Sequence, residues 1–163
     1  MKYVLIAIFG LSLGSFVNAL VWRMREQGKA VNKDSKSSKY SIVNGRSMCV
    51  HCKHILSWHD LVPVFSWLAL KGRCHYCKKT ISWQYPVIEL LVSILAITSI
   101  VFWPFAINSL LDWLVFVVWI LSLVPMVALV IYDLRWMIMP TRLIYSFDIL
   151  VGIFVLLLAG SSK

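Results

Sequence analysis

Four apolar segments, each long enough to cross a lipid bilayer, divide this chain of 163 residues into spans and loops. They cover residues 3–22, 85–103, 113–132 and 143–159. A membrane-spanning helix needs about 20 predominantly apolar residues, because each residue advances the helix by about 1.5 Å. Hydrophobic residues make up 60% of the chain and charged residues only 14%, which excludes an ordinary soluble domain. The sequence therefore predicts an all-α integral membrane protein with about four transmembrane helices.

Positive charge is concentrated in the long loop that follows the first apolar segment. Residues 23–79 hold twelve Lys or Arg against three acidic residues, an excess equal to the whole net charge of +9. Because basic loops beside membrane helices are retained in the cytoplasm, we expect this loop to be cytoplasmic and the protein to be multi-pass. A basic patch can also bind nucleic acid, but no recognition motif or aromatic-interleaved basic face accompanies this one. We therefore expect the lipid bilayer, and no nucleic acid, as a partner.

The four cysteines of the chain form two CxxC pairs within this loop. They are Cys49 and Cys52, then Cys74 and Cys77. Two such turns can supply the tetrahedral all-sulfur ligand set of a structural Zn²⁺ site. The alternative is a pair of disulfides, which needs an oxidising compartment. A cytoplasmic loop favours a four-cysteine zinc-binding module, and the four thiolates would leave the nearby histidines (His51, His54, His59 and His75) outside the ligand set.

These features divide the chain into three parts. The parts are residues 1–22, the first transmembrane helix; residues 23–84, a basic linker and zinc-binding module; and residues 85–163, which hold the other three helices. Within the middle part, residues 32–39 are typical of a flexible linker. Residues 61–70 are apolar but too short to span, and Pro63 interrupts them. We expect this segment to lie against the bilayer surface or the helix bundle.

Small and polar residues recur on one face of the first span. Gly10, Gly14 and Asn18 lie four residues apart, so they share one side of a helix. Small residues allow two membrane helices to approach closely, and an asparagine in lipid needs an interhelical partner. The spacing alone favours a packing stripe over a chemical site.

Two acidic residues lie near the ends of apolar spans. Asp133 follows the third span and Glu89 lies one turn into the second. A carboxylate in such a position is costly unless it is paired or hydrated, so it marks a candidate functional site. The alternatives are an interfacial Asp133 solvated or paired with Arg135, and a Glu89 paired with a nearby basic residue.

Motifs spread along almost the whole chain occur in a fixed order. They are Gly14-Ser-Phe-Val-Asn18 followed by Arg23, the two CxxC pairs, Leu61-Val-Pro63 between them, Tyr85-Pro-Val-Ile-Glu89, and Asp133-Leu-Arg-Trp-Met-Ile-Met-Pro140. In this order they resemble the amino-terminal part of the type IV prepilin peptidases, the aspartic peptidase family A24. These are enzymes of the inner (plasma) membrane that remove the leader of type IV pilin-like precursors.

The resemblance implies an activity and a role for Asp133. It implies hydrolysis of leader peptides by an aspartic-type endopeptidase in which Asp133 is one catalytic carboxylate. It also extends to methylation of the new amino terminus with S-adenosylmethionine, although no glycine-rich nucleotide loop identifies cofactor-binding residues. Pilin-like precursors are the implied partners, in pilus, secretion or competence systems.

The second carboxylate that this mechanism needs has no counterpart in the sequence. An aspartic protease uses two carboxyl groups that share a proton. The second family aspartate lies in a Gly-x-Gly-Asp motif, which this chain does not contain, and Asp148 has no such glycine-rich turn. We therefore expect the chain to be incomplete alone, because of a truncated gene or because a second chain or protomer supplies the aspartate. The other open function is a non-catalytic zinc-binding scaffold for pilus or secretion assembly.

Overall fold

The computed structural model describes residues 1–31, 41 and 45–161. Its helices are α1 (Lys2–Val31), η2 (Trp58–Leu61), α2 (Phe65–Ala69), α3 (Gln84–Val101), α4 (Leu110–Trp136) and α5 (Thr141–Ser161). In this described part no β-strand forms, and α1, α3, α4 and α5 are the four helices long and apolar enough to cross a membrane. The predicted all-α fold with four spans is confirmed. The linker predicted at residues 32–39 lies outside the described residues.

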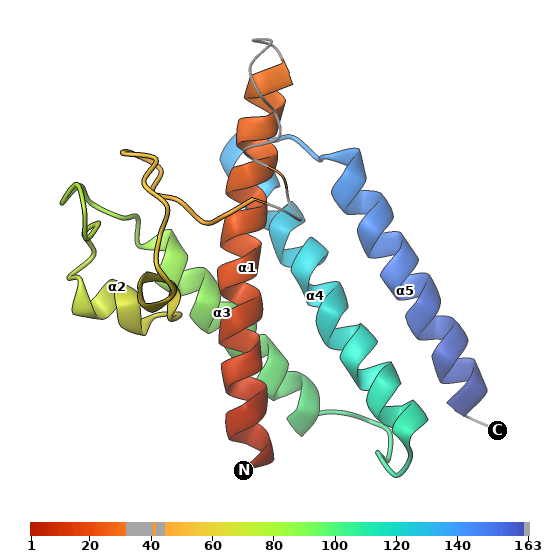
Figure 1. Cartoon of the computed structure of the whole chain (residues 1–163). Helices are drawn as coiled ribbons and strands as arrows, with labels where there is room; N and C mark the ends of the chain where they lie inside the picture. The colour runs from red at the N-terminus through yellow and green to blue at the C-terminus, as the bar shows by residue number, and fades with distance from the viewer. Residues whose placement is uncertain (32–40, 42–44, 162–163) are drawn as a thin grey trace.

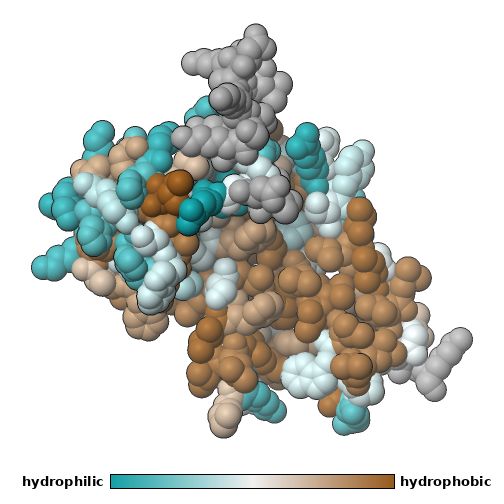
Figure 2. Space-filling model, viewed as in Figure 1, coloured by the Kyte–Doolittle hydropathy of each residue, from teal (hydrophilic) through white to brown (hydrophobic). Residues whose placement is uncertain are grey.

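The four long helices lie side by side and alternate in direction, so the amino terminus and the end of α5 lie at the same end of the bundle (Figure 1). Helix α1 packs against α3 and α4, and α5 packs against α4. Val17, Val92 and Ala128 are fully buried where α1, α3 and α4 meet. Figure 2 shows hydrophilic residues over the loop module at the upper left and hydrophobic residues over the helices below. This separation is what a multi-pass membrane protein with one polar loop module requires.

Helix α1 ends later than the first apolar segment. The segment was predicted to end at residue 22, whereas the helix continues to Val31. Its last turns carry strong helix formers and a Glu26–Lys29 ion pair of 2.8 Å, and the Arg25 guanidinium lies 4.9 Å from the centre of the Trp136 ring. A helix of 30 residues is about 45 Å long, which exceeds the hydrocarbon thickness of a bilayer. The basic end of α1 therefore extends beyond the apolar core towards the loop module.

Helix α4 has defined signals at both ends. At its start, the Asp112 N–H donates to the Ser109 hydroxyl (3.2 Å) and the Ser109 N–H donates to the Asp112 carboxylate (2.8 Å). This capping box starts the helix at Leu110, earlier than the predicted residue 113. At its end, Met137 adopts a left-handed conformation (φ 51°), and its N–H donates to the Asp133 carbonyl.

The predicted small-residue stripe on α1 forms its contact with α3. A Cβ atom at Gly10 would lie 2.7 Å from the Ser93 Cα, and one at Gly14 would lie 2.6 Å from the Glu89 Cα. Both distances are too short for any larger side chain without movement of the backbone. The packing interpretation is thus confirmed for Gly10 and Gly14, and the close approach places Asn18 directly beside the start of α3.

We expect Gly14→Ala to lower the free energy of unfolding by about 1–3 kcal/mol, because its new methyl group meets the α3 backbone. The matched control is Gly28→Ala on the same helix, where a new Cβ meets no atom of the described residues within 4 Å apart from the adjoining backbone of the helix itself. That change should stabilise α1 by about 0.5–1 kcal/mol through helix propensity. Unfolding of both variants in detergent micelles measures the difference. Equal effects at the two positions would contradict the close helix contact.

Candidate metal centre and adjoining cavity

The two CxxC segments fold into turns of the same shape. In the first, the Cys49 N–H donates to the His54 carbonyl (2.9 Å) and the Lys53 N–H donates to the Cys49 carbonyl (3.0 Å). The segment 74–79 repeats both hydrogen bonds with the same lengths. Lys53 and Lys78, each directly after a second cysteine, adopt left-handed conformations with φ of 59° and 57°. These bends fold each chain back, so both cysteines of a pair point towards one centre.

The four sulfur atoms lie within 4.8 Å of one another, although the two turns are far apart in the sequence. The Cys49 and Cys77 sulfurs are 3.9 Å apart, and no disulfide joins any of the four cysteines. A tetrahedral ion with metal–sulfur bonds of about 2.3 Å separates its ligands by about 3.8 Å. A disulfide would need a sulfur–sulfur distance of about 2.05 Å. The geometry therefore suits a metal ion held by Cys49, Cys52, Cys74 and Cys77.

The cysteines differ in burial and in acidity. Burial raises the pKa of the Cys49 thiol to about 11, while the backbone N–H of Lys79 lowers the pKa of the Cys77 thiol to about 7. Cys77 therefore ionises more readily than Cys49 near neutral pH. The exposed side chain of Cys52 gives an incoming ion access, whereas Cys49 and Cys74 are buried on the far side of the site.

The histidines make contacts outside the sulfur cluster. His51 Nε2 lies 3.3 Å from the Thr80 carbonyl, and His75 Nδ1 lies 3.8 Å from the Asp60 carboxylate. The His54 ring lies 3.8 Å from the Tyr76 ring. In the part of the chain that the structure describes, no histidine joins the four cysteines in a metal-binding group.

The apolar segment between the two turns is fixed to α3 by a buried carboxylate. Val64 has φ 60° and ψ −50° and is the central residue of a three-residue turn, closed by a 2.6 Å hydrogen bond from the Phe65 N–H to the Pro63 carbonyl. This conformation is strained for a β-branched residue. The Val64 N–H donates to the Glu89 carboxylate at 2.6 Å, and Glu89 is only 7% exposed. Among the described residues, Glu89 thus bonds to the Val64 N–H and the Ser15 hydroxyl, and no basic side chain lies at ion-pair distance from it.

Asn18 joins α1 to the start of α3. Its amide nitrogen donates to the Tyr85 carbonyl (3.0 Å) in the first turn of α3. Its Oδ1 atom is buried without a hydrogen-bond partner in the described structure. The interhelical partner predicted for this asparagine is therefore the Tyr85 carbonyl, and the structure also places Asn18 in the wall of a cavity.

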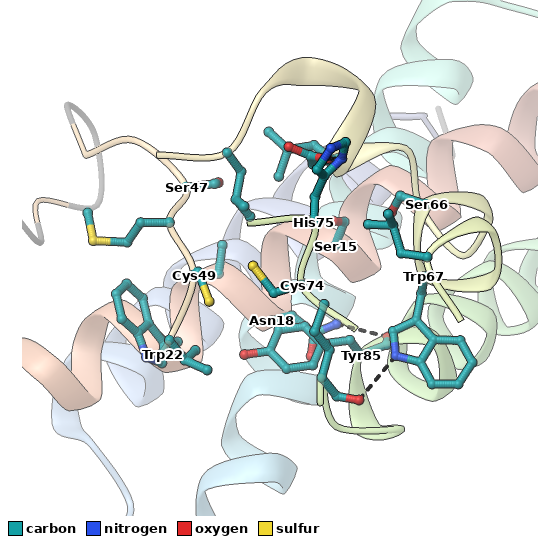
Figure 3. Close-up of a pocket in the computed structure, with 18 of the residues that line it drawn as sticks. Ser15, Asn18, Trp22, Ser47, Cys49, Ser66, Trp67, Cys74, His75 and Tyr85 are labelled. Carbon is teal, nitrogen blue, oxygen red and sulfur yellow. Dashed lines mark hydrogen bonds and ion pairs between the residues drawn. The ribbon is translucent and has the colours of Figure 1, made fainter. Parts of the chain in front are cut away.

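A cavity of about 150 Å³ lies between α1, the start of α3 and the loop module. Figure 3 shows Asn18 and Trp22 of α1 on the same cavity as Cys49, Cys74 and Tyr85. Motifs that are far apart in the sequence therefore meet at one site; Asn18 and Tyr85, for example, are separated by 67 residues. In the sequence these motifs stand apart, and the signals for their meeting were the helical spacing from Gly10 to Asn18 and the need of Asn18 for an interhelical partner.

We expect Glu89→Ala to lower the free energy of unfolding by about 1–3 kcal/mol, since it leaves a buried N–H without its carboxyl acceptor. It should also expose residues 61–70 to limited proteolysis. Glu89→Gln keeps one carbonyl acceptor and should lose less stability. Glu26→Ala, which removes the partly exposed ion pair with Lys29, should cost under about 1 kcal/mol. Proteolysis of Glu89→Ala at the wild-type rate would contradict the role of this carboxylate.

Asp133 lies in the last turn of α4, and its side chain is exposed. Among the described residues its carboxylate makes no ion pair with Arg135 or any other base. A negative charge at the carboxyl end of a helix is unfavourable because it opposes the helix dipole. Stabilisation of the helix end therefore does not explain an aspartate at position 133. Asp133 also lines neither of the two cavities described in this structure.

The fold and the sulfur cluster define a class: a multi-pass helical membrane protein with a loop module whose four cysteines can hold a metal ion. Residues 8–105 match the family model of the bacterial peptidase A24 N-terminal domain. The chain belongs to this family. The resemblance to the type IV prepilin peptidases, drawn from the motifs, is thereby confirmed.

Several curated proteins are similar to the chain. It is 37% identical over 123 residues to the "Type 4 prepilin-like proteins leader peptide-processing enzyme" of Escherichia coli O78:H11, covering 69% of this chain and 46% of that protein. It is 32% identical to the "Prepilin leader peptidase/N-methyltransferase" of Aeromonas hydrophila, covering 85% of this chain and 50% of the relative. The Vibrio cholerae protein of the same name is 32% identical, with 95% and 58% covered.

These matches extend over much of this chain but only part of each relative. The chain spans about half the length of these curated relatives. No solved structure shows a significant match. The family model ends before Asp133, whereas a match that covers 95% of the chain necessarily includes that residue.

Proposed function

We propose that this chain takes part in removing the leader peptides of type IV pilin-like precursors at the inner (plasma) membrane. The observation that carries the proposal is the family match over residues 8–105, since the similar curated proteins are named for leader processing. Four membrane-spanning helices suit a substrate presented at the bilayer. The basic charge of residues 23–79 supports a cytoplasmic position for the loop module.

Zn²⁺ is the metal that best suits the four cysteines. All-sulfur tetrahedral sites with CxxC spacing are typical of structural zinc, and a complete set of four protein ligands leaves no position for a substrate. The ion would hold the two turns together and so fix the loop module against α1 and α3. Its role would be structural rather than chemical.

The proposed chemistry requires two carboxyl groups. Asp133 supplies one, exposed at the end of α4 where a peptide can reach it. One carboxylate takes a proton from water as the water attacks the peptide carbonyl, and the protonated carboxyl of the pair donates to the leaving nitrogen. The second carboxylate comes from a segment that bears Gly-x-Gly-Asp, in this or another polypeptide. A second protomer is the other source.

Methyl transfer from S-adenosylmethionine is a further proposal that rests on the family resemblance and on the names of the relatives. No residue of this chain is assigned to the methyl donor. The test supplies purified protein with a labelled methyl donor and a pre-cleaved pilin peptide. Absence of labelled product on the pre-cleaved peptide would remove this activity from the proposal.

The leader-processing proposal can be tested in a host that lacks its own prepilin peptidase. A pilin-like precursor is expressed with this chain alone, and then together with a segment that carries Gly-x-Gly-Asp. We expect cleavage in the second combination. Unprocessed precursor in both combinations would contradict the leader-processing proposal. If pilus or secretion assembly nevertheless required this chain, that result would support the scaffold function.

A further inference from the structure

A second cavity, of about 510 Å³, lies where the polar ends of α1 and α4 meet the first CxxC turn; we call it the basic cavity. Trp22 and Arg25 of α1 and Arg135 and Trp136 of α4 form part of its walls, and Lys53 lines it from the loop module. It shares only a few residues with the smaller cavity and does not include any cysteine. Its chemistry is therefore distinct from that of the metal centre.

The walls of the basic cavity carry an excess of positive charge. Four basic residues line it, Arg25, Lys29, Lys53 and Arg135, against one acidic residue, Glu26, so their net charge is +3. Glu26 is already engaged, at 2.8 Å from Lys29 and 3.7 Å from Lys53. In the described part of the chain, neither arginine has a carboxylate at ion-pair distance. An anion in the cavity would meet uncompensated charge.

Both arginines converge on one aromatic ring. The Arg25 guanidinium lies 4.9 Å and the Arg135 guanidinium 5.7 Å from the centre of the Trp136 ring. The ring stabilises each cation, but the two like charges repel each other. A phosphate between them would relieve that repulsion, because guanidinium groups donate paired hydrogen bonds to phosphate oxygens.

The depth of the basic cavity in the membrane favours a lipid as the source of the phosphate. Arg25 lies near the end of the first span, and Arg135 and Trp136 are the last two residues of the third span. Tryptophan and arginine at span ends lie at the level of the lipid headgroups, and basic pockets between spans bind anionic headgroups. The indole rings of Trp22 and Trp136 add an apolar wall beside the charges.

We propose that the basic cavity binds the phosphate of an anionic phospholipid headgroup, of the phosphatidylglycerol type, between the inner ends of α1 and α4. Such a lipid would join α1, α4 and the loop module at a point remote from the sulfur cluster. This inference goes beyond leader processing and does not depend on it.

Native mass spectrometry of the purified full chain tests the proposal. Titration with dioleoylphosphatidylglycerol and with dioleoylphosphatidylcholine compares an anionic and a zwitterionic headgroup on identical acyl chains. We expect tighter binding of the anionic lipid. The double variant R25Q/R135Q should weaken that binding about 30-fold, from about fivefold for each charge lost near the membrane surface. The matched control R142Q removes an exposed arginine outside the cavity and should change nothing.

Three results would overturn the assignment. Equal binding of the two lipids by wild-type protein is the first, and it requires no variant to fold. Unchanged lipid preference in R25Q/R135Q, with zinc content and helical circular dichroism as in wild type, is the second. Stabilisation by inorganic phosphate or by a glutamate-rich peptide to the same degree as by phosphatidylglycerol is the third, since it would assign the cavity to a soluble anion.

Discussion

Replacing Cys74 with serine is expected to remove bound zinc from the purified protein and to unfold the loop module. Cys74 is 2% exposed, and its sulfur is one of four that converge within 4.8 Å. Zinc binding contributes about 10–16 kcal/mol to small modules of this kind. The described module holds only two short helices, η2 and α2, so few other interactions can replace the ion. Metal analysis should give one zinc per wild-type chain and less than about one tenth of that in Cys74→Ser.

The control for this prediction is His75→Ala, which changes the neighbouring residue. His75 is exposed and lies outside the sulfur cluster, so this variant should keep one zinc per chain. Limited proteolysis of both variants reports on folding: residues 45–83 should become sensitive only in Cys74→Ser. A wild-type protein that is metal-free and carries two disulfides would contradict the metal centre and, with it, the reducing environment assigned to the loop.

The sequence predicted the helical membrane fold and the cluster of four cysteines because both depend on strong local signals. Span length and apolar content identify membrane helices without knowledge of their packing, and CxxC spacing identifies paired thiolates without knowledge of the loop between them. The Gly10–Gly14 stripe likewise predicted a close helix contact, and the structure supplies its partner, α3. Each of these predictions rests on a pattern that can be read within continuous segments of the chain: an apolar span, a CxxC turn or a helical repeat of small residues.

The features that could not be predicted from the sequence depend on contacts between distant segments. In the strained turn at Val64, the backbone N–H donates to Glu89, which lies 25 residues away in the sequence. No local pattern predicts a left-handed valine, since tertiary contacts impose this conformation. The basic cavity is similar: Arg25 and Arg135 belong to separate helices, and only the packing of α1 on α4 brings both to Trp136.

The start of α4 differs from its predicted position for a local reason. The Ser109–Asp112 capping box begins this helix at Leu110.

Asp133→Asn is expected to separate activity from stability. If Asp133 is one of the two catalytic carboxylates, its loss should reduce leader cleavage at least about 100-fold, the lower range for general acid–base catalysis. The free energy of unfolding should stay the same or rise by about 0.3–1 kcal/mol, because the substitution removes a negative charge from the carboxyl end of α4. A residue retained for structure would give the opposite result, with lower stability and cleavage reduced in proportion.

Asp148→Asn is the matched control for Asp133→Asn, because it makes the same chemical change at an exposed position on the adjacent helix α5. The rate of precursor conversion is measured in membranes that contain each variant together with the Gly-x-Gly-Asp segment. Cleavage should continue at the wild-type rate in Asp148→Asn. Full cleavage in Asp133→Asn would exclude this carboxylate from the reaction, and loss of cleavage in both variants would indicate that Asp148 supplies the second carboxylate. Only selective loss in Asp133→Asn agrees with a pair completed from elsewhere.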